Sequence, residues 1–143
     1  MTKAITQIEK VIYTAKAHTT GGREEGTSRT SDGRLDVKLT APGAKGDGTN
    51  PEQLFAVGWS SCFLSAIKLE AAATKVRLPA NVAVDAEVDL GATDGAYFLQ
   101  ARLNVSLPDI DRETAQKLVD GAHRRCPYSK AVHGNINVVT SLV

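Results

Sequence analysis

The stretch from Thr49 to Lys75 most constrains how this chain folds, because it is the longest apolar run of the sequence. Asn50 and Pro51 are typical of a helix N-terminus, since an asparagine side chain caps the first amides and proline lacks the N–H that would be unbonded there. Apart from one carboxylate in the first turn, charged side chains return only from Lys68 onward. A helix whose first half is apolar nearly all round is buried on most sides. We therefore predict a long central helix that needs cover from more than one direction.

The central helix presents two stripes of side chains, and one of the two cysteines, Cys62, lies in its middle. An apolar stripe recurs at helical spacing and consists of Phe55, Trp59, Cys62, Ala66 and Leu69. A second stripe of small residues, which would let another element approach closely, consists of Gly58, Ser61 and Ser65. A lone cysteine on an apolar stripe is often a small, inert core residue, so its reactivity has to be argued from the rest of the chain.

The rest of the chain predicts strands around two helices. Alternation and turn residues predict strands over Glu9 to His18, Gly26 to Ser31, Leu35 to Leu39, Val82 to Leu90, Tyr97 to Leu107 and Ile136 to Val143. A second helix runs from Asp111 to Arg125, stops at Pro127, and has an apolar face of Ala115, Leu118, Val119, Ala122 and Cys126. This order predicts an α+β fold with largely antiparallel sheets packed on two helices, in a single domain over 1–143. The best cover for the central helix is the same helix of a second copy, so we expect an intertwined homodimer.

Composition argues against several classes of function. The formal net charge is +1 and the basic residues are scattered, so we expect no nucleic-acid partner. The apolar run is interrupted by Ser60, Lys68 and Glu70, which does not suit a membrane span. The first residues, MTKAITQIEK, lack the pattern of a secretory signal, so we expect a cytoplasmic protein. In that compartment, two cysteines are more consistent with transient redox chemistry than with a static disulfide.

A metal site and a hydrolase site are weaker interpretations of the same residues. Cys62, His123 and Cys126 could share a metal ion, but they would need a fourth ligand and no paired spacing supplies one. A cysteine–histidine hydrolase would need a histidine oriented beside the thiol, and no sequence signature provides it. We expect His123 instead to lie on a helix surface, with its positive form favoured by the helix C-terminus.

The two cysteines are not electrostatically equivalent. Cys126 falls at a helix C-terminus, where the dipole disfavours a thiolate. Cys62 lies beyond the first turn of its helix in apolar surroundings, so it needs a nearby cation in order to react. A guanidinium held by a carboxylate would serve, because it stays protonated when partly buried. Arg23, after a glycine turn, and Glu52, in the first turn of the central helix, are candidates that composition alone does not single out.

Three motifs resemble those of one protein family. The run Gly48 to Ala56 followed by Cys62-Phe63, the run Thr20 to Arg23, and the run Ala122 to Ser129 followed by Gly134-Asn135-Ile136 stand in the sequence in that form. They resemble the central motif, the N-terminal arginine motif and the second cysteine motif of the organic hydroperoxide resistance (Ohr) proteins in the OsmC/Ohr superfamily. The position of Arg23 directly after two glycines favours the Ohr branch over the OsmC branch.

The resemblance implies a thiol-dependent peroxidase with no metal or organic cofactor. Cys62 would attack the O–O bond of an organic hydroperoxide, and the resulting sulfenic acid would form a disulfide with Cys126. A dithiol would reduce this disulfide by exchange, and the family implies lipoyl groups on lipoylated proteins as the partner. Arg23 would stabilise the Cys62 thiolate, and Glu52 would hold Arg23.

The resemblance also implies a preference for organic peroxides. Apolar side chains around the thiol would bind the alkyl group of the substrate, namely Phe55, Trp59 and Phe63. Two alternatives remain: a redox sensor that uses the same cysteine pair without turnover, and a non-catalytic small-molecule binding module. The near-neutral charge and the absence of a basic helix argue against a sensor that binds DNA.

Overall fold

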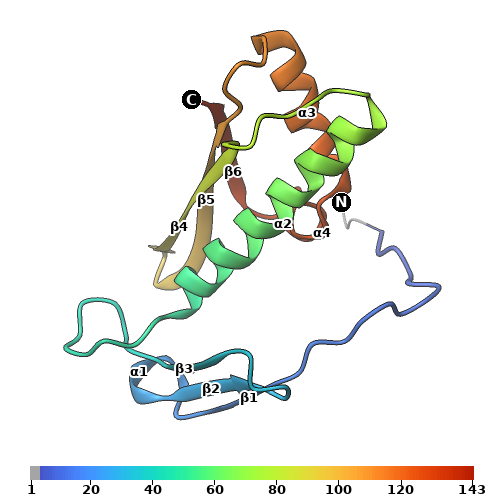
Figure 1. The fold of residues 1–143 in the computed structure, drawn as a ribbon. Helices are drawn as coiled ribbons and strands as arrows, with labels where there is room; N and C mark the ends of the chain where they lie inside the picture. Colours follow the sequence, from blue (N-terminus) through green and yellow to red (C-terminus); the bar gives the residue numbers. More distant parts are fainter. Residues whose placement is uncertain (1–3) are drawn as a thin grey trace. The chain divides into compact units, whose positions relative to one another are not determined.

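The computed structural model describes residues 4–143 and divides the chain into two compact units, one ending at Asn50 and the other beginning at Pro51. The expectation that the whole chain is a single domain stays a prediction. The first unit contains β1 (Ala17–Thr20), α1 (Gly22–Glu25), β2 (Thr27–Thr30) and β3 (Asp36–Lys38). Its strands form an antiparallel sheet in the order β1-β2-β3, and β2 and β3 lie within the strands predicted over Gly26 to Ser31 and Leu35 to Leu39 (Figure 1).

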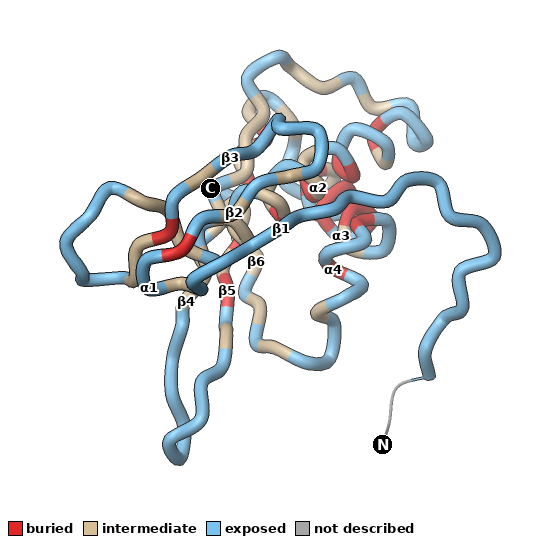
Figure 2. Tube along the Cα trace, turned by 90° about the horizontal axis from the view of Figure 1, so that it is seen from below, coloured by how far each residue is buried: buried red, intermediate tan, exposed pale blue. Residues whose placement is uncertain are grey.

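The predicted strand from Glu9 to His18 is wrong over most of its length, because β1 begins only at Ala17. Alternation of apolar and polar residues makes a strand only where another strand pairs with it. No ladder among the described residues includes the segment 4–16. This segment is exposed throughout (Figure 2), and Ile12 is 93% exposed.

The second unit is a three-stranded sheet with helices on one face. It contains α2 (Pro51–Ala73), β4 (Ala83–Thr93), β5 (Ala96–Ser106), α3 (Arg112–Arg125), α4 (Pro127–Val132) and β6 (Asn137–Leu142). The sheet order is β4-β5-β6, with β4 antiparallel and β6 parallel to β5. The α+β class, the long central helix and the largely antiparallel sheets are therefore confirmed, with β6 as the one parallel strand. The sequence did not predict α1 or α4.

Local sequence explains where the elements of this unit begin and end. Pro51 opens α2, and the helix closes where Lys75 adopts a positive φ of 59° and the Val76 N–H bonds to the Ala71 carbonyl. Asp94 and Gly95 both have positive φ, which is the backbone conformation of a two-residue hairpin turn between β4 and β5. Asp111 caps α3, because its carboxylate accepts the Thr114 N–H at 3.0 Å.

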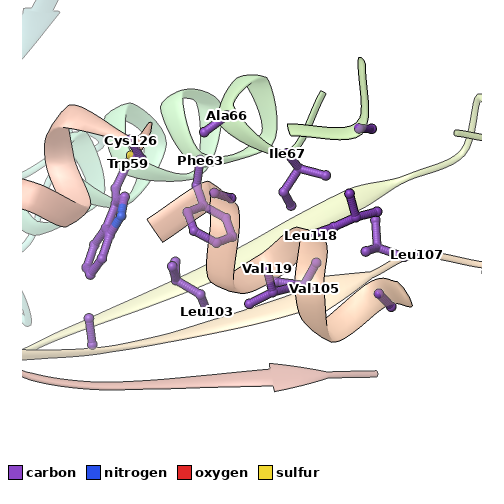
Figure 3. Packing of buried hydrophobic residues seen from close by; sticks show 14 residues of the cluster. Trp59, Phe63, Ala66, Ile67, Leu103, Val105, Leu107, Leu118, Val119 and Cys126 are labelled. Carbon is purple, nitrogen blue, oxygen red and sulfur yellow. The ribbon is translucent and has the colours of Figure 1, made fainter. Parts of the chain in front are cut away.

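The core lies between α2, α3 and the sheet, with side chains of both helices pointing toward the strands (Figure 3). The apolar face predicted for α3 is buried as expected. The stripe predicted for α2 is partly wrong: Leu69 is 60% exposed, whereas Phe63 and Ile67 are fully buried. The error arose because α2 is apolar on several sides, so periodicity alone did not identify the face that meets the sheet.

By length and composition alone, α2 is also apolar enough to cross a membrane. Five of its side chains are nevertheless buried in the core, and core helices meet the same length and composition test. These buried residues are Trp59, Phe63, Ala66, Ile67 and Ala71. The described structure therefore uses α2 as the core helix of the second unit.

Candidate functional site

The two cysteines lie in contact. The thiols of Cys62 and Cys126 share a hydrogen bond, and the two sulfur atoms are 3.3 Å apart. Both thiols are free, and Cys62 is half-buried whereas Cys126 is fully buried. A disulfide needs sulfur atoms about 2.05 Å apart, so a small movement would join them. The pair therefore has one thiol that solvent reaches and a second thiol held behind it.

Cys126 stands at the junction of two helices. Its N–H bonds to the Ala122 carbonyl and closes α3, and its carbonyl accepts the Lys130 N–H in the first turn of α4. Pro127 requires an extended residue before it, and Cys126 has φ −65° and ψ 119°. Proline also suits the first position of a helix. The predicted stop at Pro127 is thus also the start of α4, and Cys126 caps helices on both sides.

The surroundings of Cys62 favour its protonated form. Burial raises the pKa of the Cys62 thiol, and the neighbouring Cys126 raises it further. The backbone N–H of Tyr128, in the first turn of α4, lowers it. Because the raising effects prevail, these surroundings by themselves favour the thiol over the thiolate at neutral pH.

Three aromatic rings from α2 and α4 pack together beside the first turns of α2. Phe55 meets the rings of Trp59 and Tyr128 edge to face, with centroids 5.8 Å and 6.0 Å away. The Tyr128 hydroxyl lies where a side chain on Gly58 would begin, since a Cβ built there would be 2.5 Å from it. The small residue at Gly58 therefore admits Tyr128 of the same chain, whereas Ser61 and Ser65 are exposed.

A chain of hydrogen bonds, buried at Trp59 and Ser129 and half-buried at His123, links α2, α4, α3 and β6. Trp59 Nε1 donates to Ser129 Oγ at 3.1 Å. Ser129 Oγ lies 3.0 Å from His123 Nδ1, and His123 Nε2 lies 2.8 Å from Thr140 Oγ1. The expectation that His123 is a charged surface residue is wrong, because burial among these partners lowers its pKa.

A second contact holds the end of α3 against α2. Arg125 Nε donates to Glu70 Oε2 at 2.6 Å, and the Glu70 side chain is only 14% exposed. Gly121 packs directly on Glu70, where a Cβ would collide with the carboxylate. Cys126 is therefore fixed by an ion pair on the residue before it and by the Ser129 hydrogen bonds on the α4 side.

The proposed cation and its carboxylate belong to different units. Arg23 lies in α1, where Gly21 and Gly22 both have positive φ, a conformation that glycine adopts without strain. Glu52 lies in the first turn of α2. The structure brings together Cys62, Cys126 and the aromatic side chains within the second unit. The approach of Arg23 and Glu52 to Cys62 stays a prediction.

Metal ligation is not supported by the geometry of the described residues. No group of three His, Cys, Asp or Glu side chains between residues 4 and 143 lies close enough to hold a metal ion. His123 directs both ring nitrogens to hydroxyl groups rather than to the thiols.

Sequence reasoning missed Tyr128 and Ser129 as parts of the site, and it considered His123 only as a metal ligand or as a charged surface residue. Each is polar and lies within three residues of Cys126, but nothing in the hydrophobic pattern marks it. The signal that was available is Pro127 directly after an apolar cysteine, a sequence that favours a new helix and would have placed Ser129 in its first turn.

The fold and the site together define a class of protein, a small α+β protein in which a free thiol on α2 lies in contact with a second free thiol at the junction of α3 and α4. The family model for OsmC-like proteins matches residues 42–141. An organic hydroperoxide resistance protein of Xanthomonas axonopodis pv. citri is 49% identical over 138 residues, covering 94% of this chain and 96% of that protein. The chain belongs to the OsmC-like family and, within it, to the organic hydroperoxide resistance proteins.

Solved structures agree with this assignment. The crystal structure of OhrB of Bacillus subtilis matches with a TM-score of 0.88 at 38% identity, covering 93% of this chain and all of that one. An organic hydroperoxide resistance protein of Legionella pneumophila matches with a TM-score of 0.87 at 40% identity, covering 93% of this chain and 98% of that one. Both matches extend over almost the whole chain, so the fold similarity includes both compact units.

Proposed function

We propose that this protein is a thiol-dependent peroxidase that detoxifies organic hydroperoxides, including those of lipids. The single observation that carries the proposal is the contact between the half-buried Cys62 and the buried Cys126, with sulfur atoms 3.3 Å apart. The names of the similar proteins, which refer to organic hydroperoxide resistance, support the same substrate class.

The first step is a two-electron oxidation of Cys62. Its thiolate attacks the distal oxygen of R–O–O–H, the O–O bond breaks, and Cys62 becomes a sulfenic acid while the alkoxide leaves and takes a proton to become the alcohol. In the second step the Cys126 sulfur attacks the Cys62 sulfur and displaces the hydroxyl group. The Cys126 proton leaves with that hydroxyl as water, and the products are a Cys62–Cys126 disulfide and one water molecule.

A reductant then returns both thiols. A dithiol attacks the disulfide by exchange and leaves as its own cyclic disulfide, so the electrons of each cycle come from the dithiol. Lipoyl groups on lipoylated proteins are the proposed physiological source. The cycle needs no metal or organic cofactor bound to the protein.

Arg23 and Glu52 complete the proposed site. The pKa of Cys62 is raised by burial, so the thiolate needs a positive partner. Arg23 would supply a guanidinium charge that stays protonated, and Glu52 would orient it through paired hydrogen bonds. The alkyl group of the substrate would contact Phe55, which is half-buried, while Trp59 and Phe63, both fully buried, would form the apolar wall behind it.

A cytoplasmic, intertwined homodimer is the proposed working state. Isolated chains seldom leave large apolar side chains clustered in solvent. The segment 4–16 exposes five of them, Ile5, Ile8, Val11, Ile12 and Tyr13, and α2 separately exposes Val57 and Leu69. A second copy of the chain would cover such surfaces and also supply the additional cover that the apolar first half of α2 requires.

Turnover with a hydroperoxide tests this function. Purified protein is mixed with cumene hydroperoxide and either dihydrolipoamide or reduced thioredoxin, and peroxide loss is followed over many cycles. We expect sustained turnover with dihydrolipoamide, none in Cys62→Ser, and a single reaction in Cys126→Ser that ends in sulfenic or sulfinic acid. Oxidation of both cysteines without repeated peroxide consumption would favour a redox sensor, and no thiol oxidation at all would favour a binding module.

A further inference from the structure

The hydrogen bonds that join Trp59, Ser129, His123 and Thr140 have no part in the chemistry proposed above. They connect four elements, since these residues lie on α2, α4, α3 and β6 respectively. Ser129 is 5% exposed and is the buried polar side chain of the described residues. A polar side chain that is buried and fully bonded at such a junction restrains the position of the element that carries it.

The protons of this chain can be assigned by counting donors. Trp59 Nε1 only donates, so Ser129 Oγ accepts from it. The Ser129 hydroxyl proton then has His123 Nδ1 as its partner, and His123 Nε2 carries the ring proton and donates to Thr140 Oγ1. In the opposite tautomer Ser129 would accept two hydrogen bonds and its own proton would have no partner. The bonds thus run in one direction, with a neutral imidazole in the middle.

We propose that neutral His123 is a positioning residue that fixes α4, and through α4 the thiol of Cys126, for capture of the Cys62 sulfenic acid. The proposal deepens the proposed function, because it concerns the second step of that cycle. Cys126 directly precedes α4, and the Tyr128 N–H in its first turn acts on Cys62. Ser129 directly follows Tyr128, so a restraint on Ser129 restrains both the Cys126 thiol and the Tyr128 N–H.

The geometry of the second step explains why this restraint matters. The Cys126 sulfur has to move from 3.3 Å to about 2.05 Å from the Cys62 sulfur while it displaces the hydroxyl group. Misplacement of a reacting atom by about 1 Å slows a reaction by roughly a hundredfold. An α4 released from His123 would leave the first step possible but delay disulfide formation, and the exposed sulfenic acid would then be open to further oxidation.

The hydrogen bonds of this chain also require that His123 is neutral. An imidazolium donates from both nitrogens, so His123 Nδ1 could no longer accept the Ser129 hydroxyl proton. Ser129 Oγ would then accept two hydrogen bonds, and its own proton would lose its partner. The groups that act on its ionisation are Asp120 on α3 and His133 at the end of α4, while α2 contributes the Phe63 ring at 4.6 Å and β6 the Thr140 hydroxyl. Burial outweighs Asp120 and keeps the imidazole neutral.

Two variants of nearly equal shape test the proposal. His123→Asn keeps an acceptor near the position of Nδ1 for the Ser129 hydroxyl, whereas His123→Leu does not. After one equivalent of cumene hydroperoxide, disulfide formation is followed by rapid quenching and mass spectrometry, with dimedone trapping the sulfenic acid. We expect His123→Leu to form the disulfide at least about tenfold more slowly than wild type, and His123→Asn to recover most of that loss.

The control is Leu118→Ala, which destabilises the buried core without touching the hydrogen bonds. A disulfide rate unchanged in Leu118→Ala but reduced in His123→Leu supports positioning. Equal rates in His123→Leu and His123→Asn, or an equal loss in Leu118→Ala at similar stability, would overturn the proposal. Nitrogen–proton NMR correlations of the wild-type His123 ring give a readout that depends on no variant folding, and a ring proton on Nδ1 at neutral pH would also overturn it.

The test can fail independently of the proposed function. The same series is repeated with diamide, an azo oxidant that accepts one thiolate and releases its hydrazine when the second thiol attacks, so the disulfide forms without any hydroperoxide. If the wild type did not react with hydroperoxides but formed the disulfide quickly with diamide, the proposed peroxidase function would be refuted. The positioning role of His123 could still be tested with diamide. Slow diamide oxidation confined to His123→Leu would support the positioning role alone.

Discussion

Substitution of Gly58 by alanine should separate the stability of the protein from the reactivity of its thiols. Gly58 lies on α2, one turn before Cys62. The new methyl group would lie 2.5 Å from the Tyr128 hydroxyl oxygen and 3.0 Å from the ring carbon that bears it. Ordinary contacts between such atoms are about 3.5 Å, so the tip of the ring has to retreat by about 1 Å.

The expected change in stability is small because two effects oppose each other. Alanine favours the interior of a helix over glycine by about 1 kcal/mol. Displacing the Tyr128 ring from Phe55 and Gly58 costs about 1–3 kcal/mol as overpacking, and less where the moving group reaches solvent, as Tyr128 does at 39% exposure. We expect the free energy of unfolding in urea to change by less than about 2 kcal/mol.

The expected change in reactivity is larger. Movement of Tyr128 shifts its backbone N–H away from Cys62 and disturbs Cys126, two residues earlier. Diamide-driven formation of the disulfide should therefore slow roughly tenfold. The second substitution Tyr128→Phe removes the colliding oxygen and should restore most of the rate, and Gly91→Ala, where a Cβ meets nothing within 4 Å, should match wild type. A double variant no faster than Gly58→Ala would refute this account of the packing.

Four further outcomes follow from the structure and the proposed site. Leu103→Ala, which empties a fully buried position, should lower the free energy of unfolding by about 2–5 kcal/mol in urea titration. Burial lowers the pKa of His123 below its ordinary value of 6.5, so the neutral ring contributes its full stability above pH 6.5, and that contribution is lost as the pH falls. Urea unfolding from about pH 8 to about pH 5 should therefore show a decrease in the free energy of unfolding of the wild type that is absent in His123→Asn. Arg23→Ala should raise the pKa of Cys62 and slow its reaction with hydroperoxide by roughly tenfold or more, measured by thiolate absorbance and stopped flow, and an unchanged titration would assign the charge to another cation. Mixed dimers of Cys62→Ser and Glu52→Ala subunits should regain about half of the wild-type activity if Glu52 acts across a two-fold interface, whereas activity near zero in confirmed heterodimers would place it within its own chain.

The elements of the second unit other than α4 were predictable because their signals are local. A proline at Pro51, an N-cap at Asp111 and a two-residue turn at Asp94-Gly95 each specify a boundary through the backbone chemistry of a few neighbouring residues. Strict alternation over Val82 to Leu90 likewise identified a half-buried strand. The segment 9–16 has the same alternation and is not a strand, because pairing depends on a partner that alternation does not reveal.

The site was predictable as a set of residue types but not as a geometry. Motif resemblance selected Cys62 and Cys126, yet only the fold shows their sulfur atoms 3.3 Å apart. The role of His123 was misjudged, since a helix C-terminus favours its charge while burial opposes it, and burial is a property of the tertiary structure. Ser129 and Tyr128 follow from the start of α4, a six-residue helix too short for periodicity to mark.

One anaerobic single-turnover measurement tests the central claim most directly. Reduced protein is mixed with one equivalent of cumene hydroperoxide per chain, and alcohol, residual peroxide and the oxidation state of each cysteine are quantified together by chromatography and peptide mapping. The account predicts one alcohol per hydroperoxide consumed and one Cys62–Cys126 disulfide per chain, with Cys62→Ser consuming none. Hydroperoxide consumption that persists in Cys62→Ser, or alcohol formed while both cysteines remain reduced, would contradict it.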